Sequence, residues 1–450
     1  MDVSYHSLAD EIGRDIAEGR LGPGDRLPPH RDYAYRRGIA VSTAGRVYKE
    51  LVRRGLVVGE VGRGTFVRAV SPAPATQLGV PDAPSGLVNL EASIPILEGQ
   101  DALLAPVLAD LLRPDVLAAS QILLPRTGTQ AAREAAAAFL ARDGWTPSPD
   151  DMLLAASGRR AVAAALAALA APGDKVAVEA VTYPMVKGLA ARLGIVLVPV
   201  PLDPNGLRPD ALAQVHRETA GGVKAVYVQP SLHNPLSLTM PPSRRRELAE
   251  TLERTGIVAI EDSVYGFLAQ DQAPLAVFAP DHVIHIDSLS KRVAPGLTVG
   301  MLAVPPRLRQ AVAASLHTGA WTPNAFALEA AVLLLRSGLA ADISERKRQD
   351  ARRRQELVRD RLAGLTLRTD PTSYHCWLEL PAPWRAETFV AAAARRGIAV
   401  TPGASFAAGP GHAPNAVRIA LGLPPMAVLD EALGTLRMLA LGGPDDFAVE

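Results

Sequence analysis

Several kinds of residue are scarce in this chain, and each scarcity excludes a class of protein. The single cysteine, Cys376, excludes a disulfide framework and a thiolate-rich metal site, and we expect no metal. A formal charge of +1 over 450 residues gives no overall field that would attract a polyanion. There is no signal peptide and no long uncharged apolar stretch, so we expect a soluble, cytoplasmic protein without membrane contact.

Lysine is also scarce, since it supplies six of the 47 basic residues and arginine the other 41. A lysine amine can lose its proton and form an imine with an aldehyde, which an arginine cannot do. Lys291 is the lysine of most interest, because it follows a predicted strand at residues 282–287, and strand ends are where open α/β sheets bind ligands. A solvated surface lysine is an equally good interpretation of this position alone.

The length and the apolar fraction of 48% predict two or three packed domains. Residues 1–69 combine three helical patterns with a Gly-rich hairpin at their end. Residues 70–87 contain four prolines and no helical periodicity, which is typical of a linker. Residues 88–450 form the remaining domain, with a large unit at about 105–310 and a smaller α+β unit at about 320–450.

Charge is uneven within the N-terminal segment. Residues 27–68 carry nine basic and three acidic side chains, a net charge of +6, whereas residues 1–26 have a net charge of −3. Binding to a phosphate backbone needs such a local basic face. The third helical pattern begins at Val41, and a reader of the major groove makes its base contacts near the start of such a helix.

The motifs Leu27-Pro28-Pro29-His30-Arg31, Ser42-Thr43-Ala44-Gly45-Arg46-Val47-Tyr48 and Gly62-Arg63-Gly64-Thr65-Phe66-Val67 resemble the winged helix-turn-helix of the GntR superfamily. The resemblance covers nearly all of this segment. It implies that double-stranded DNA is bound by Arg31, Ser42, Thr43, Arg46, Arg63 and Gly64. One departure is Ala40, where the family often has a serine or threonine that caps the helix. A small basic domain that docks on another protein is the alternative.

The rest of the chain alternates short apolar segments with helical patterns. This rhythm predicts an α/β fold with a mainly parallel sheet covered by helices on both faces. Seven segments are expected to be strands: residues 152–156, 175–181, 195–200, 223–229, 257–262, 282–287 and 299–304.

Polar side chains follow several of these predicted strands. Asp262 could keep a pyridine nitrogen protonated, and Tyr265 and Asn234 could donate to a phenolic oxygen on the same ring. The sequence Ser157-Gly158-Arg159-Arg160 joins a strand to a helix and could hold a phosphate. Each motif alone has a plain structural interpretation, such as a helix cap, a turn or a core aromatic.

In this order, and with Lys291 29 positions after Asp262, the motifs resemble the fold type I aminotransferases over residues 88–445. The resemblance implies a pyridoxal 5'-phosphate (PLP) cofactor with Lys291 as its Schiff-base lysine. Asp262 then pairs with the pyridine nitrogen. The resemblance also implies that Tyr265 and Asn234 bind the ring hydroxyl and that Tyr183 stacks on the ring face. It implies that the phosphate is bound by Ser157, Gly158, Arg159, Arg160 and Ser288. A substrate carboxylate would be bound by Arg418, together with Asn234.

Two departures from that family concern the phosphate. Thr298 stands where the family usually has an arginine, seven residues after the lysine, and Leu123 stands where a tyrosine often reaches the partner subunit. Both changes weaken the expected phosphate site, and Arg159, Arg160 or Arg126 are the candidates to compensate.

A GntR-type reader joined by a linker to an aminotransferase-like domain resembles the MocR-type transcriptional regulators. The resemblance implies a homodimer whose DNA binding responds to an amino acid or amine. A catalytically active aminotransferase with an accessory DNA-binding domain is the alternative, because the residues needed for transamination are present. A third interpretation is a DNA-binding protein whose second domain has lost its cofactor.

Overall fold

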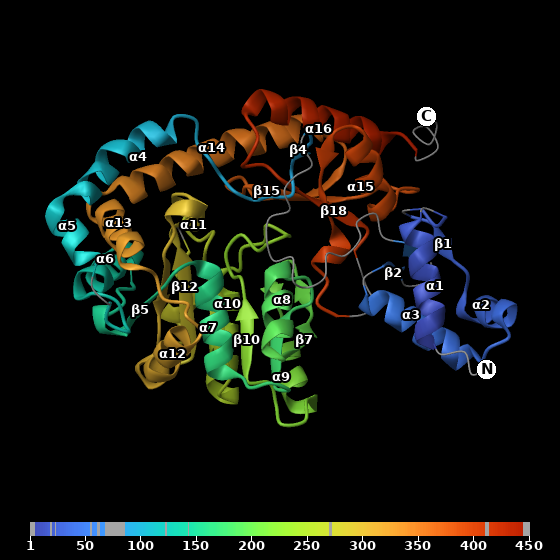
Figure 1. Ribbon diagram of the computed structural model, residues 1–450, viewed down its shortest axis with the longest axis horizontal. Coiled ribbons are helices and arrows are strands. Elements are labelled where there is room, and N and C mark those ends of the chain that lie inside the picture. Colours follow the sequence, from blue (N-terminus) through green and yellow to red (C-terminus); the bar gives the residue numbers. More distant parts are fainter. Residues whose placement is uncertain are drawn as a thin grey trace.

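A computed structural model describes residues 5–18, 20–22, 24–54, 56–60, 64–67, 86–121, 124–142, 144–269, 272–409 and 414–443. Arg63, Leu123 and residues 70–85 of the predicted linker lie outside the described residues. Figure 1 shows a small N-terminal unit (blue) beside a unit built from the C-terminal part of the chain (orange and red). A larger unit with a central sheet lies below the C-terminal unit.

The N-terminal unit contains three helices and a three-stranded antiparallel sheet in the order β1-β3-β2. Its helical core comes from the apolar spacing in the sequence, since Leu8 and Ile12 of the first helix pack against Val47 and Leu51 of the third. Its elements are α1 (Tyr5–Ala17), β1 (Arg26–Leu27), α2 (His30–Arg37), α3 (Val41–Arg53), β2 (Val57–Glu60) and β3 (Gly64–Val67).

The large unit is built on a seven-stranded sheet in the order β5-β13-β12-β11-β10-β6-β7. All seven segments predicted to be strands are strands. The sheet is parallel except for β13, which runs antiparallel to both of its neighbours. The strands are β5 (Met152–Ala155), β6 (Lys175–Glu179), β7 (Val196–Val200), β10 (Ala225–Val228), β11 (Val258–Asp262), β12 (Val283–Ser288) and β13 (Gly300–Ala303).

Except along the edge strand β7, where Val196 is 48% exposed, both faces of this sheet are buried, which explains why its strands are mostly apolar and do not alternate. Alternate residues of one strand enter different cores: Val226 of β10 packs beneath α9 and α10, whereas Ala225 and Tyr227 pack beneath α7, α8 and α12. The covering helices are α4 (Gln100–Leu108), α5 (Pro114–Ala119), α6 (Gln130–Leu140), α7 (Gly158–Leu169), α8 (Pro184–Leu193), α9 (Pro209–Glu218), α10 (Pro242–Thr255), α11 (Leu289–Arg292), α12 (Pro306–Thr318) and α13 (Ala325–Arg336).

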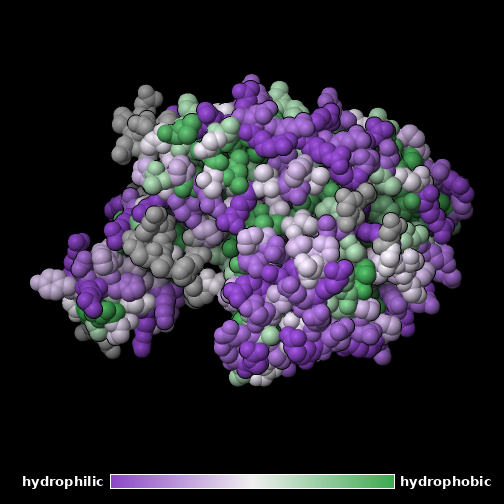
Figure 2. All heavy atoms as spheres, turned by 180° about the vertical axis from the view of Figure 1, so that it is seen from behind, coloured by the Kyte–Doolittle hydropathy of each residue, from purple (hydrophilic) through white to green (hydrophobic). Residues whose placement is uncertain are grey.

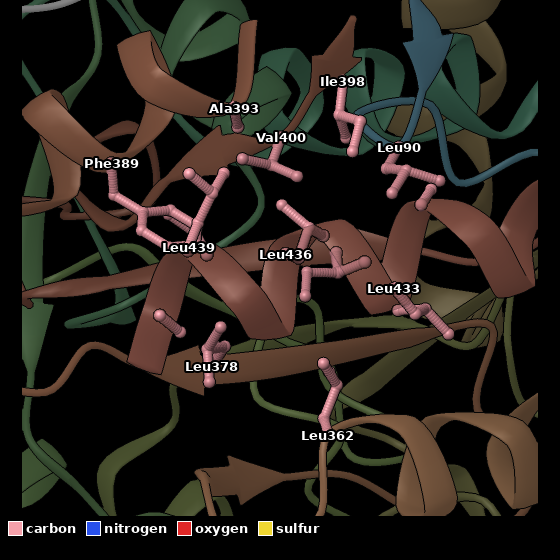
Figure 3. Close-up of a cluster of buried hydrophobic side chains, with 14 of the residues drawn as sticks. Leu90, Leu362, Leu378, Phe389, Ala393, Ile398, Val400, Leu433, Leu436 and Leu439 are labelled. Carbon is pink, nitrogen blue, oxygen red and sulfur yellow. The ribbon is translucent and has the colours of Figure 1, made fainter. Parts of the chain in front are cut away.

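The small unit has a four-stranded sheet in the order β14-β15-β18-β17 and three helices. Figure 3 shows its core, where Leu433, Leu436 and Leu439 project from one helix toward Leu90 and Phe389. Leu90 follows β4 (Val88–Asn89), which pairs with β16. The other elements are α14 (Leu339–Arg361), β14 (Thr366–Arg368), β15 (His375–Glu379), α15 (Ala386–Arg395), β16 (Ile398–Ala399), β17 (Thr401–Pro402), the 3-10 turn η5 (Gly403–Ser405), β18 (Ala416–Ala420) and α16 (Met426–Leu441).

Hydrophilic residues predominate on the face of the molecule that Figure 2 shows, with smaller hydrophobic patches between them. Among the residues that the structure describes, no helix has both the length and the apolar character needed to cross a membrane. Within the same residues, no group of three or more His, Cys, Asp and Glu side chains is placed to hold a metal ion.

Candidate functional site

The candidate site lies where parallel strands of the large sheet end. Asp262 is the last residue of β11 and Ser288 the last residue of β12, and these two strands pair in parallel. The helix α7 begins at Gly158, shortly after the end of β5. Ligands bind at this edge of open α/β sheets, because loops and helix N-termini converge there.

Asp262 is buried, and each of its carboxylate oxygens is hydrogen-bonded. Oδ2 accepts from the Tyr227 hydroxyl at 2.6 Å and from Gln229 Nε2 at 3.3 Å, while Oδ1 accepts from the backbone N–H of Val264 at 3.3 Å. Burial raises the pKa of Asp262, and these hydrogen bonds oppose that rise. A carboxylate fixed in this way can hold a proton on a facing nitrogen.

Lys291, Tyr265 and Ser93 meet at the centre of the site. Lys291 Nζ donates to the backbone carbonyl of Ser93 and lies 5.9 Å from the centre of the Tyr265 ring. The Tyr265 hydroxyl donates to Ser93 Oγ at 2.8 Å. Burial, together with the nearby Arg159 and Arg418 cations, lowers the pKa of Lys291 to about 7. Burial raises the pKa of Tyr265 to about 12, so its hydroxyl keeps its proton.

The start of α7 closely approaches the end of β12. Ser157 caps α7 by accepting from the backbone N–H of Arg160 at 3.3 Å. A Cβ at Gly158 would come within 3.0 Å of Ser288 Oγ, so only glycine leaves this space open. Ser288 is 1% exposed, and its hydroxyl has no hydrogen-bond partner in the described part of the chain.

Two arginines were predicted near the phosphate, and the structure separates them. The Arg159 and Arg160 side chains are both exposed. Arg159 nevertheless hydrogen-bonds the Tyr183 hydroxyl and lies close enough to Lys291 to lower its pKa, whereas Arg160 shows no such contact with the site among the described residues. Thr298 does not supply the missing arginine's charge, and its hydroxyl hydrogen-bonds Ser290 Oγ at 2.6 Å. Arg126 is exposed as well. We therefore expect Arg159 to compensate for Thr298, because of the three arginines it is the one with contacts to Tyr183 and Lys291 among the described residues.

Arg418 closes the side of the site that the small unit provides. Its NH1 donates to Asn234 Oδ1 at 3.1 Å, and its NH2 donates to Thr401 Oγ1 at 3.2 Å and to the backbone carbonyl of Glu91. The side chain is 6% exposed, and burial lowers its pKa. Its Nε has no hydrogen-bond partner among the described residues, so a donor remains for a carboxylate.

The site also contains residues that the sequence did not single out. Ser93 contacts both Lys291 and Tyr265, and Tyr227 and Gln229 hold Asp262. Ser93 lies in an irregular segment with no periodic pattern, about 200 residues from Lys291. The pattern around Tyr227 and Gln229 indicated only a buried strand, and no sequence signal tied either residue to Asp262.

The N-terminal unit presents its predicted DNA-binding residues on α2 and α3. Arg31, Ser42 and Arg46 are exposed, and Thr43 is half-buried. Ala40 precedes α3 without a side-chain cap, as its departure from the family pattern predicted. Gly64 has φ +126°, and a Cβ there would come within 2.8 Å of Arg26 Nε, so this position of β3 requires glycine.

The fold and the site together define a winged helix-turn-helix joined to a PLP-dependent transferase fold. The aminotransferase class I and II family matches residues 89–436, and the bacterial regulatory proteins of the gntR family match residues 4–67. An archaeal alanine:glyoxylate aminotransferase structure superposes with a TM-score of 0.72 at 24% identity, over 79% of this chain and 91% of that chain.

Proteins with both domains are similar along most of this chain. The HTH-type transcriptional regulator YdeF of Bacillus subtilis is 31% identical over 97% of this chain and 94% of its own length. The pyridoxine biosynthesis regulator PdxR of Corynebacterium glutamicum is 27% identical, over 80% of this chain and 78% of its own length. The chain belongs to the MocR-type regulators, in which a GntR-family reader precedes a class I and II aminotransferase domain.

Pyridoxal 5'-phosphate is the cofactor of this domain. The residues present fit it. The unpaired Ser288 hydroxyl and the start of α7 at Gly158 suit a phosphate, the buried Asp262 suits a pyridinium nitrogen, and the Lys291 amine suits an aldehyde.

Proposed function

We propose that this protein is a PLP-dependent transcriptional regulator whose binding to double-stranded DNA responds to an amino acid. The observation that carries the proposal is the presence, in one chain, of an exposed recognition helix with Arg46 and a buried site with Lys291 and Asp262. Either half alone would fit a plain repressor or a plain aminotransferase.

The roles of the cofactor-site residues form part of the proposal. When bound, PLP supplies an aldehyde that condenses with primary amines and a ring that withdraws electrons. Lys291, whose pKa is lowered to about 7, would hold the aldehyde through its neutral amine, and Asp262 would hold a proton on the ring nitrogen. Tyr265 and Asn234 donate to the ring hydroxyl, and Tyr183 stacks on the ring. Ser157, Gly158, Arg159, Arg160 and Ser288 hold the phosphate.

Arg418 supports an effector that carries a carboxylate. Its guanidinium is buried and keeps one unpaired N–H, and a bidentate carboxylate would satisfy a charge that is otherwise costly to bury. An amino acid therefore fits better than a simple amine.

We further propose the DNA contacts and the assembly. Arg31, Ser42, Thr43, Arg46, Arg63 and Gly64 contact DNA. The chain divides into a reader (residues 1–69), a linker (70–87) and a cofactor domain (88–450). We propose a cytoplasmic homodimer, supported by the exposed apolar side chains of Leu112, Leu117 and Phe326, which lie on elements that pack on one another.

The test uses the purified full-length protein loaded with PLP. Genomic DNA fragments that it retains are sequenced, and a retained fragment is then titrated with and without each of the 20 standard amino acids. We expect at least one amino acid to shift the DNA affinity, and Arg418→Met to abolish that shift while leaving DNA binding intact.

The same samples, mixed with 2-oxoglutarate, test the alternative. Turnover at ordinary enzyme rates, on the order of one per second or more, without any amino-acid effect on DNA binding would favour an aminotransferase. Absence of a cofactor mass after borohydride reduction would contradict both functions.

A further inference from the structure

The hairpin β2–β3 of the N-terminal unit is here called the wing, and the described residues at its base are buried on both faces. Val57 and Val67 pack into the core of the N-terminal unit. Val58 and Phe66 each lie one residue closer to the hairpin turn, and their side chains point to the opposite face because side chains alternate along a strand. Yet Val58 is only 8% exposed and Phe66 only 3% exposed. Something outside the core of the N-terminal unit covers this second face.

The small unit provides that cover (Figure 1). Ala404 of η5 packs against both Val58 and Phe66. The guanidinium of Arg385, at the start of α15, lies 3.9 Å from the centre of the Phe66 ring. Gly24 lies so close to α15 that an added Cβ would be 2.1 Å from Thr388 Cγ2. The wing is therefore seated on η5 and the N-terminus of α15.

Two residues beyond Ala404, the same segment reaches the ligand site. Phe406 is fully buried, and its ring lies 5.1 Å beneath the Arg418 guanidinium. The Phe406 carbonyl accepts from the backbone N–H of Thr182 at 2.8 Å, directly before Tyr183. One short segment thus contacts the wing, the proposed carboxylate site and the proposed ring-stacking residue.

This segment, residues 403–408, is here called the bridging segment, and it has little freedom to absorb a displacement. Lys187 Nζ donates to the carbonyls of Ser405 at 2.5 Å and Ala407 at 3.0 Å. A Cβ at Gly403 would meet the Pro414 carbonyl oxygen at 2.5 Å. Because packed segments move as bodies, a shift at Phe406 is passed to Ala404.

We propose that the bridging segment couples the ligand site to the wing, so that occupancy of the cofactor and carboxylate site changes how firmly the wing docks. This inference rests on the proposed function. A ligand shifts such an equilibrium only if it contacts the two states differently. The two states would be contacted differently, because a ring stacked on Tyr183 would lie beside the Thr182–Phe406 hydrogen bond, and a carboxylate bound in the plane of the Arg418 guanidinium would fix the cation whose face packs on the Phe406 ring.

Hydrogen exchange measured by mass spectrometry tests the coupling in the full-length chain, with PLP as the probe. We expect PLP to slow exchange of the wing amides at residues 64–67 by about fivefold or more, the lower end of ordinary allosteric coupling. In Phe406→Leu, PLP still binds but the wing no longer responds. Because linkage is reciprocal, Phe66→Ala should weaken PLP binding by the same factor.

Tyr35→Ala is the matched control, since Tyr35 is another aromatic residue of the N-terminal unit but is 90% exposed. It should retain the wild-type PLP affinity and the wild-type response of the wing. Unchanged wing exchange in wild-type protein that carries the cofactor, or a full response in Phe406→Leu, would overturn the inference. Borohydride reduction separates this result from failure of the proposed function, in which no sample gains the cofactor mass.

Discussion

Burial of Lys291 favours its neutral amine, which is the form that reacts with an aldehyde. A lysine in water keeps its proton to about pH 10, whereas desolvation and the Arg159 and Arg418 cations lower the pKa of Lys291 to about 7. Asp262 is buried as well, but its hydrogen bonds from Tyr227 and Gln229 favour the charged form. The two groups are thus set for different tasks by their surroundings.

The first prediction concerns the pH at which apoprotein captures PLP. Only the neutral amine attacks an aldehyde, so the rate should rise about tenfold per pH unit below 7 and level off above it. The rate is followed by the visible absorbance of the attached cofactor, with Nα-acetyl-lysine as the reference amine. Arg418→Met removes a cation that lowers the pKa of Lys291, so the plateau should begin at a higher pH. A wild-type rate that still climbs near pH 10 would contradict the buried amine.

The second prediction separates the two arginines that follow Gly158. Arg159→Gln should weaken PLP binding by about tenfold or more, because charge-assisted hydrogen bonds contribute about 1.5–3 kcal/mol. Arg160→Gln is the comparison variant and should weaken PLP binding less, since Arg160 lacks the contacts with Tyr183 and Lys291 that Arg159 has among the described residues. Fluorescence titration of apoprotein with PLP measures both affinities. Equal losses would show that the phosphate draws on the whole α7 N-terminus rather than on Arg159.

Sequence patterns predicted the residues that carry distinctive chemistry but not those that support them. Lys291, Asp262, Tyr265, Asn234 and Arg418 follow strand ends or lie in recognisable motifs, and the structure brings them together. Ser93 was missed because its role comes from long-range folding, which places an irregular segment over Lys291. No local pattern encodes such a contact.

At the scale of elements, the seven sheet strands were predictable because a buried parallel sheet needs short, continuously apolar segments. The antiparallel direction of β13 was not predictable, since the composition of a strand does not indicate its direction in the sheet. The two-residue strand β1 was also missed, because two residues carry no period. The contacts between elements, such as the seat of the wing on η5, depend on tertiary packing and were not foreseen.

The third prediction tests the packing of β13 against the start of α7. A Cβ at Gly300 would lie 2.5 Å from the Ser157 carbonyl oxygen and 3.1 Å from the Gly158 nitrogen. Gly300→Ala should therefore lower the free energy of unfolding by about 1–3 kcal/mol and weaken PLP binding, because the start of α7, where we expect the phosphate, must shift.

Gly434→Ala in α16 is the control for Gly300→Ala, since no atom lies within 4 Å of its added Cβ. Alanine in a helix interior is favoured over glycine by about 0.5–1 kcal/mol, so this variant should be slightly more stable and bind PLP normally. Urea unfolding and PLP titration measure the two effects. A Gly300→Ala protein with wild-type affinity would show that PLP binding does not depend on the packing of β13 against the start of α7.

At the scale of the whole molecule, a near-neutral chain contains a basic reader. The formal charge of +1 hides the local excess, because residues 1–26 are acidic and residues 27–68 are basic. Salt bridges such as Arg37–Glu11 and Arg54–Asp10 join the acidic helix α1 to the basic part, so part of that charge is already neutralised. The arginines left exposed on α2 and α3 then determine how strongly the reader binds phosphates.

The final prediction measures that contribution without knowledge of an operator. On a duplex of arbitrary sequence, the logarithm of the binding constant falls linearly with the logarithm of salt concentration, with a slope of about 0.9 per phosphate contact. Arg46→Ala should reduce the slope by about 0.9 per reader, because Arg46 is exposed near the start of α3. Arg14→Ala, an exposed arginine of α1, should leave the slope unchanged. Fluorescence anisotropy across a salt series measures both. Equal reductions in the two variants would mean that phosphate attraction is spread over the unit and that α3 is not the helix that approaches DNA.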